Sequence, residues 1–70
     1  MADVKAQMAG TVLEVLVAEG QAVEEGQDLV CLESMKMQMF LQAEGTGTVA
    51  AVKVEAGDFV NEGDILVVLS

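Results

Sequence analysis

The sequence lacks several residue types, and each absence excludes a class of function. Its 70 residues include no histidine, proline, tryptophan or tyrosine, and only one cysteine, Cys31. A zinc site built from histidine and cysteine ligands is therefore excluded, as is an intrachain disulfide. Because no nucleophile–base pair is visible either, we do not expect the chain to be an enzyme itself. Cys31 lies in the apolar run LVCLES and is predicted to be a small buried hydrophobe.

Positive charge is also scarce. Three lysines stand against twelve acidic residues, which gives a net charge of −9. This balance argues against nucleic-acid binding, which needs clustered cations, and against attraction to anionic membranes. No apolar stretch approaches membrane-spanning length, and the N-terminal MADVKAQMAG lacks the pattern of a secretory signal. We expect a cytoplasmic protein that docks, if at all, on basic partner surfaces.

Aromatic residues make up 3% of the chain, whereas hydrophobic residues make up 53%. The core must therefore consist of valine, leucine, isoleucine, alanine and methionine, a composition that favours thin β layers. No sustained apolar pattern at helical spacing is present. We predict one small domain over residues 1–70, with a modest core, and we expect it to be a monomer.

An internal repeat organises the chain. The segment GTVLEVLVAEGQAVEEGQDLVCLE, from Gly10, aligns without a gap with GTVAAVKVEAGDFVNEGDILVVLS, from Gly47, and half of the positions are identical. Two copies are too few for a solenoid. They predict a domain with quasi-two-fold symmetry, in which each half supplies an equivalent sheet.

Each repeat is predicted to contain two main strands joined by a segment rich in turns. Each of the two turn segments has two glycines six residues apart, which supply positive φ angles. We predict a flattened barrel or sandwich of two small antiparallel sheets, with about four strands in each. The main predicted strands are residues 11–17 and 28–34 in the first repeat and residues 48–54 and 64–70 in the second.

The alignment also predicts which strand face is buried. Leu16 aligns with Lys53, so that face tolerates charge and is expected to point outward. The neighbouring valines are then predicted to point into the core, and one valine between each pair of glycines is predicted to anchor the turn segment. These core valines are Val15, Val17, Val23, Val52, Val54 and Val60.

The junction between the repeats, Ser34 to Gln38, has unusual turn chemistry. A strand enters it and a strand leaves it, so the link must be a tight hairpin with Met35 and Lys36 near its tip. Two-residue hairpin turns prefer Asn-Gly or Asp-Gly because both central residues take positive φ, and none of these residues occurs here. Such a conflict between local preference and topology marks a functional or strained site. The symmetry places this tip at one end of the molecule and both termini at the other.

This segment also has structural interpretations that require no function. A lysine at a hairpin tip is usually a solvated charge, and a row of methionines is usually core. Strand alternation assigns Met39 to the core, whereas Met35 and Met37 flank the tip. Phe40 alternates with Met39, so it is predicted to be partly exposed, either as a partner contact or as a half-buried packing residue.

The segment ESMKM, together with the paired signatures around VEEGQ and VNEGD, resembles the biotinyl/lipoyl carrier domains over nearly the whole chain. Met-Lys-Met is similar to the biotin-attachment motif of that family. The resemblance implies the family's flattened eight-stranded barrel, two four-stranded antiparallel sheets with quasi-two-fold symmetry. It also implies that Lys36 carries biotin through an amide, with Met35 and Met37 as flanking recognition residues and Ser34 and Glu33 as support for the hairpin.

The chain departs from the family pattern in a few places. Gln7 stands where the family often has a proline, and no proline follows the hairpin. Ser34 replaces a frequent alanine, although serine is also common there. The repeat has no gap, so it leaves no room for the inserted thumb of the bacterial acetyl-CoA carboxylase carrier.

By this resemblance the domain is the substrate of a biotin protein ligase, which supplies an activated biotinyl donor to an amine that is mostly protonated at neutral pH. It then shuttles carboxybiotin between a biotin carboxylase and a carboxyltransferase or decarboxylase, and its own contribution is tethering. The acidic turn residues are expected to be solvated or to dock on basic partners; they include Glu24, Glu25, Glu62 and Asp64.

Two alternatives remain open. A lipoyl carrier shares the fold and the lysine position, but lipoyl domains usually show Asp-Lys-Ala, so biotin is favoured over lipoate. An unmodified lipoyl-like interaction module is the other alternative, and the lysine retained at the junction counts against it.

Overall fold

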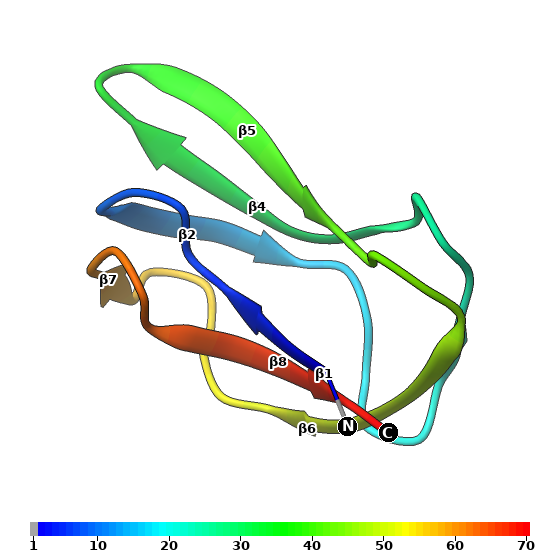
Figure 1. Ribbon diagram of the computed structural model, residues 1–70. Coiled ribbons are helices and arrows are strands. Elements are labelled where there is room, and N and C mark those ends of the chain that lie inside the picture. The colour runs from blue at the N-terminus through cyan, green and yellow to red at the C-terminus, as the bar shows by residue number, and fades with distance from the viewer. Residues whose placement is uncertain (1) are drawn as a thin grey trace.

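The computed structural model describes residues 2–70 as two four-stranded antiparallel sheets, which confirms the predicted fold class (Figure 1). One sheet has the strand order β5-β4-β2-β7 and is called here the hairpin sheet; the other has the order β1-β8-β6-β3 and is called the terminal sheet. Residues 2–70 form no helix, and so none that is long and apolar enough to cross a membrane. The strands are β1 (Ala2–Lys5), β2 (Gly10–Val15), β3 (Ala22–Val23), β4 (Asp28–Ser34), β5 (Met37–Gln42), β6 (Gly47–Val52), β7 (Phe59–Val60) and β8 (Ile65–Leu69).

The prediction that each half supplies its own sheet is wrong. The hairpin sheet takes β5 and β7 from the second half of the chain, and the terminal sheet takes β1 and β3 from the first half. The exchange occurs because each turn segment crosses to the opposite sheet, where Ala22 pairs with Thr48 and Phe59 pairs with Thr11. The two halves are therefore interleaved, and neither can complete a sheet without the other.

The repeat extends to the backbone hydrogen bonds of the turn segments. The Gly20 N–H donates to the Val49 carbonyl at 2.8 Å, and 37 residues further on the Gly57 N–H donates to the Val12 carbonyl at 2.8 Å. Gly20 and Gly57 have φ angles of 90° and 97°, which glycine adopts without strain. The quasi-two-fold symmetry predicted from the sequence thus holds in hydrogen-bonding detail.

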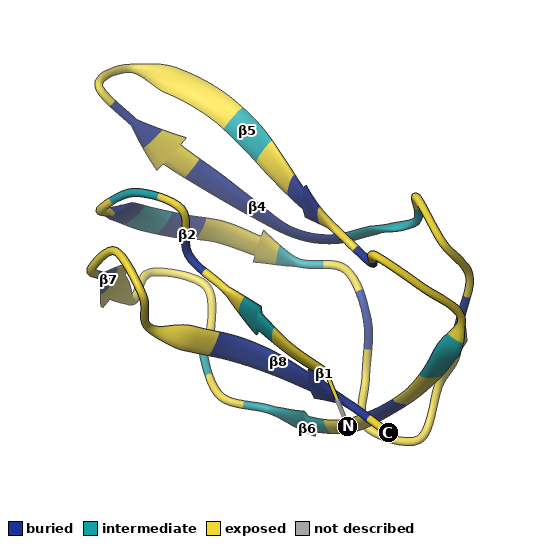
Figure 2. Cartoon of the chain, viewed as in Figure 1, coloured by how far each residue is buried: buried dark blue, intermediate teal, exposed yellow. Residues whose placement is uncertain are grey.

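The core lies between the sheets and is aliphatic. Val17, Val23 and Val60 are buried in it as predicted, while Val15, Val52 and Val54 are partly buried against it. The central strands β4 and β8 supply most of its largest fully buried side chains, and β5 is mostly exposed (Figure 2). The full set, with one residue each from β2, β3 and β6, is Leu29, Leu32, Leu66, Val12, Val23, Val30, Val49 and Val67.

Two details of the strands differ from the prediction. β2 and β6 end two residues early, at Val15 and Val52, and each has a register shift that disrupts the alternation used to extend it. The two-residue strands β3 and β7 lie within segments predicted only as turns, because two residues are too few for a periodic pattern.

The two ends of the molecule differ in how equivalent strands are connected. At one end Ala2 pairs with Leu69, so the first and last strands of the described residues lie side by side; at the other end a hairpin joins β4 to β5 (Figure 1). The prediction that the junction and the termini lie at opposite ends is confirmed.

Candidate functional site

The turn between β4 and β5 consists of Met35 and Lys36 alone. Ser34 pairs with Met37 directly before and after it, and the two turn residues have φ angles of 54° and 65°. Positive φ at both central positions is the type I′ geometry that suits the twist of a two-residue hairpin. The tight hairpin predicted from the sequence is confirmed, and it is built without the usual glycine or asparagine. Each left-handed residue other than glycine is strained by on the order of 1 kcal/mol.

The base of the hairpin is held against β2. The Ser34 Oγ atom donates a hydrogen bond to the Ala9 carbonyl at 2.7 Å, and the Ser34 side chain is buried. A Cβ atom on Gly10 would lie 2.6 Å from the Glu33 carbonyl oxygen, so only glycine lets β2 approach the base of the hairpin this closely. The Glu33 side chain is exposed and makes no hydrogen bond within residues 2–70. Glu33 therefore contacts β2 through its backbone.

The methionines of the segment divide between the tip and the core. Met35 is 84% exposed and Met37 is 67% exposed, whereas Met39 is partly buried and packs against the core. Lys36 is exposed between the first two. The site is therefore an amine on a projecting turn, flanked by two thioether side chains open to solvent.

Exposure alone does not single out Lys36, because Lys5 and Lys53 are exposed as well. Lys5 lies in β1 opposite Ile65, and the Lys53 N–H is bonded to the Leu66 carbonyl directly after β6. Both are therefore held in or beside a sheet. Lys36 differs because it occupies the tip of a strained turn that projects from the body of the domain.

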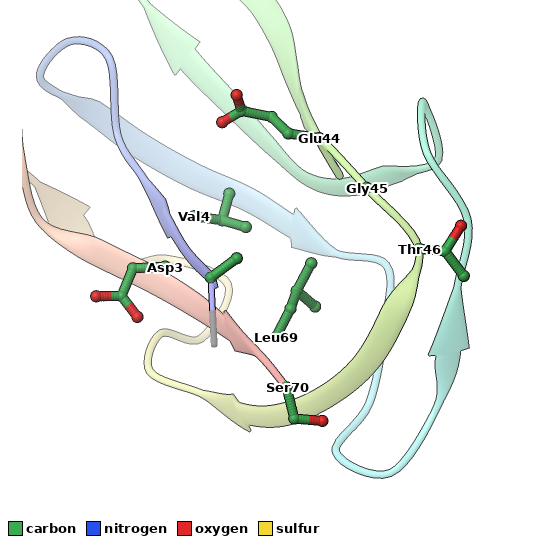
Figure 3. A pocket seen from close by; sticks show the side chains of 8 residues that line it. Asp3, Val4, Glu44, Gly45, Thr46, Leu69 and Ser70 are labelled. Atoms are coloured by element: carbon green, nitrogen blue, oxygen red, sulfur yellow. The ribbon is translucent and has the colours of Figure 1, made fainter.

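Two hollows of the surface lie away from this lysine. A cleft of about 390 Å³ lies at the terminal end, where Val4 and Leu69 extend from β1 and β8 toward the link that carries Glu44 and Thr46 (Figure 3). A second hollow, of about 450 Å³, lies between β1 and β5. Lys36 lines neither of them. An amine on a convex tip is suited to entering the site of another protein rather than to forming a site of its own.

Two aromatic side chains lie on the hairpin sheet beyond the predicted site. Phe40 is 50% exposed, in agreement with the prediction of partial exposure, and Phe59 in β7 is 65% exposed. Sequence reasoning gave Phe59 no role. The signal was present in the repeat, because Phe59 aligns with Ala22, and a position that accepts side chains of such different volume is not closely packed in the core. Cys31 is buried and free, as predicted.

Comparison with known proteins gives a consistent result. The biotin–lipoyl family model, described as "Biotin-requiring enzyme", matches residues 2–69. The Biotin/lipoyl attachment protein of Bacillus subtilis is 49% identical over 67 residues, which are 96% of this chain and 92% of that protein. The Biotinylated protein TB7.3 homolog of Mycolicibacterium smegmatis is 54% identical over 37 residues, which are 53% of this chain and 52% of that protein. The chain thus spans about half the length of the mycobacterial relatives that it matches.

Solved structures of two kinds are similar to the chain. A single-chain, multi-domain long-chain acyl-CoA carboxylase matches with a TM-score of 0.89 and 42% identity, over 94% of this chain and 6% of that one. The lipoyl domain of the 2-oxoglutarate dehydrogenase complex from Azotobacter vinelandii matches with a TM-score of 0.85 and 30% identity, over 100% of this chain and 96% of that one.

Proposed function

This chain belongs to the biotin–lipoyl family, and from that premise we propose that it is a biotin carboxyl carrier with biotin joined through an amide to the Nζ atom of Lys36. The observation that carries the proposal is the Met35–Lys36 turn, in which both residues have positive φ and the lysine is exposed at the tip. Backbone strain of this kind persists mainly at functional sites, and here it positions one amine at the tip of the turn. The two exposed methionines beside it match the Met-Lys-Met pattern of biotin attachment.

The residues of the tip fit an acylation reaction. The neutral Nζ amine attacks the activated carboxyl carbon of a donor supplied by the ligase, the amide bond forms, the nucleotide leaves and the amine loses a proton. Because only a neutral amine is nucleophilic, the ligase must enclose the tip and take up the proton of the amine. Met35 and Met37 offer soft apolar surface for that enclosure, and the short turn limits the conformational entropy lost on binding.

The rest of the domain is suited to carrying rather than to reacting. Biotin bound at Lys36 supplies a ring nitrogen that accepts a carboxyl group. The hairpin holds that group outside the body of the domain, so it can enter first a biotin carboxylase and then a carboxyltransferase or decarboxylase. Tethering raises its local concentration at both sites. The likeness to part of an acyl-CoA carboxylase supports this division of labour.

Intact mass of the protein from its native host tests the proposal. We expect the mass increment of one biotin on the unaltered chain and on the Lys5→Arg and Lys53→Arg variants, which remove the other two exposed lysines. The Lys36→Arg variant is expected to lack the increment and to give no signal on an avidin blot. Biotin that persists in Lys36→Arg contradicts the assignment of the site.

A second candidate is a lipoyl carrier. The lipoyl domain that matches the whole chain at 30% identity favours it. The same mass measurement separates the two, because a lipoyl increment at Lys36 supports this candidate and contradicts the biotin proposal. An unmodified Lys36 in the native host contradicts both and supports an interaction module.

A further inference from the structure

The outer faces of the two sheets differ in composition, although their backbones are equivalent. Both phenylalanines of the chain lie on the hairpin sheet, where Phe40 is 50% and Phe59 is 65% exposed. The equivalent positions of the terminal sheet, 37 residues earlier, hold Asp3 and Ala22. The two phenylalanine side chains, the largest apolar side chains in the sequence, thus both lie on the solvent side of the hairpin sheet.

Strand register puts these side chains on one continuous face. Met39 and Leu41 pack toward the core, so Phe40 between them points to the opposite side of the sheet. Phe59 is likewise the exposed neighbour of the buried Val60. The register forms two rows across the sheet: Gln38, Glu33, Thr11 and Phe59 in the row nearer the turn, and Phe40, Cys31 and Glu14 in the next.

Folding does not require this composition. At the positions equivalent to Leu13 and Glu14, the terminal sheet has Ala50 and Ala51, and β6 and β8 pair there with the same register shift. An equivalent sheet therefore forms with small side chains on its outer face. Exposed aromatic side chains that packing does not explain indicate an interaction surface. We call this surface, made of Leu13, Glu14, Glu33, Phe40 and Phe59, the aromatic face.

We propose that the aromatic face is the docking surface for the biotin carboxylase partner, with Phe40 and Phe59 as apolar contacts and Glu14 and Glu33 paired with basic side chains of that enzyme. The inference rests on the proposed function. Phe40 lies at the fourth residue pair from the turn, which is roughly 10 Å back along the strand. A surface set back from the tip holds the domain while Lys36 and its cargo stay free to enter an active site.

Charge favours this occupant. A biotin carboxylase binds ATP and bicarbonate, both anions, so the approach to its site must be electropositive to attract them. The carrier has a net charge of −9 and places two acids on the aromatic face, where the terminal sheet has Ala51 and Ser70. Opposite potentials steer association, and aromatic rings add cation–π contacts with arginine or lysine. A second copy of the carrier is disfavoured as occupant, because like charges would face each other.

The test uses the full chain in its biotinylated form, together with the biotin carboxylase purified from the organism that produces this carrier. The measured quantity is the rate of bicarbonate-dependent ATP hydrolysis. The double variant Phe40→Ala with Phe59→Ala is expected to raise the KM for the carrier about tenfold with kcat unchanged, as expected for removal of two contact residues. The matched control is Leu16→Ala with Ile65→Ala, which removes two exposed apolar side chains outside the aromatic face. Its KM is expected to stay unchanged.

A second pair of variants tests the charge. Glu14→Gln with Glu33→Gln is expected to lower kcat/KM at low salt and to flatten its decrease with rising salt. The control, Glu25→Gln with Glu62→Gln, removes the same charge from equivalent positions of the two turn segments. Equal effects in both pairs contradict specific docking and indicate only the influence of net charge.

The outcomes separate this inference from the proposed function. Intact mass first establishes biotin on Lys36, and urea unfolding establishes that the variants are folded. A biotinylated, folded phenylalanine double variant with an unchanged KM overturns the docking surface and leaves the carrier function standing. If the rate of biotin ligation to the phenylalanine double variant falls as much as its rate of carboxylation, the aromatic face is assigned to the ligase, and this outcome also overturns the inference. Absence of biotin on the unaltered chain contradicts the proposed function itself.

Discussion

In the terminal sheet Ala2 at the start of β1 lies beside Leu69 at the end of β8, whereas in the hairpin sheet the equivalent strands β5 and β4 are joined by Met35 and Lys36. The two sheets otherwise share strand order and register shifts. The features that both sheets share, their strand order and register shifts, are needed for folding because each sheet forms with them. What only the hairpin sheet has, a strained lysine turn and two exposed aromatic rings, is not needed to build an equivalent sheet, and these are the features for which we propose a function.

The largest expected effect tests the shared part. Leu29 and Leu66 are equivalent and both fully buried, so Leu29→Ala and Leu66→Ala should each lower the free energy of unfolding by about 2–5 kcal/mol. Because the two sheets enclose one core, the two losses should agree within about 1 kcal/mol, a margin set by how far each cavity collapses. Urea unfolding followed by circular dichroism measures both. A much smaller loss at one site would show that the halves do not share the core equally.

Glycine at the start of β2 and β6 gives the next effect. A Cβ atom at Gly10 would lie 2.6 Å from the Glu33 carbonyl oxygen, and one at Gly47 would lie 2.8 Å from the Ser70 carbonyl oxygen. Gly10→Ala and Gly47→Ala should each destabilise the fold by about 1–3 kcal/mol, as overpacking does. Only Gly10→Ala should also slow ligation at Lys36, since Glu33 leads into the hairpin whereas Ser70 lies at the opposite end of the domain. Equal ligation rates in the two variants would contradict this.

The sequence predicted the features that the repeat encodes. Alignment of the halves located the core valines, the turn glycines and the junction, because a position shared by two equivalent environments reports what the fold requires. The tight turn followed from chain length alone, since the two predicted strands left only Met35, Lys36 and Met37 between them.

The exchange of strands between sheets was beyond this reasoning. Alternation within a strand states which face is buried but not which strand lies beside it, so the pairing of Ala22 with Thr48 was invisible. The role of Phe59 was missed for a related reason: a two-residue strand carries no period, and its exposure depends on a neighbour from the other half.

Backbone strain offers a pair of variants with opposite signs. Met35 takes a positive φ without being glycine, whereas Gly57 takes one as glycine, with nothing within 4 Å of where a Cβ atom would lie. Met35→Gly should therefore raise the free energy of unfolding, because relief of the strain exceeds glycine's extra entropy in the unfolded chain, and Gly57→Ala should lower it, each by about 0.5–1 kcal/mol. Stability gained at the hairpin should come with slower ligation, since the apolar contact of Met35 is lost. Unchanged stability in Met35→Gly would show that the relief of strain does not exceed the entropy cost of glycine.

The smallest expected effect concerns the turn segments, where the halves use different chemistry for the same bond. The Asp58 Oδ2 atom accepts from the Glu55 N–H at 2.9 Å, and at the equivalent place the Gln21 Oε1 atom accepts from the Ala18 N–H at 3.2 Å. A carboxylate accepts a stronger hydrogen bond than an amide, although solvent weakens both at these exposed positions. We therefore expect Asp58→Ala to lower the free energy of unfolding by about 0.5–1 kcal/mol and Gln21→Ala by about half as much.

The variant Asp58→Gln isolates this difference, because it gives the second half the side chain of the first and keeps an acceptor at the position. It should fall between Asp58→Ala and the unaltered chain in urea unfolding. If it is as unstable as Asp58→Ala, the reach of the side chain rather than its charge sets the strength of the bond. In that case the hydrogen bond of Gln21 depends on a local backbone geometry that the second half does not reproduce. The two turn segments would then differ in local backbone geometry as well as in side chains.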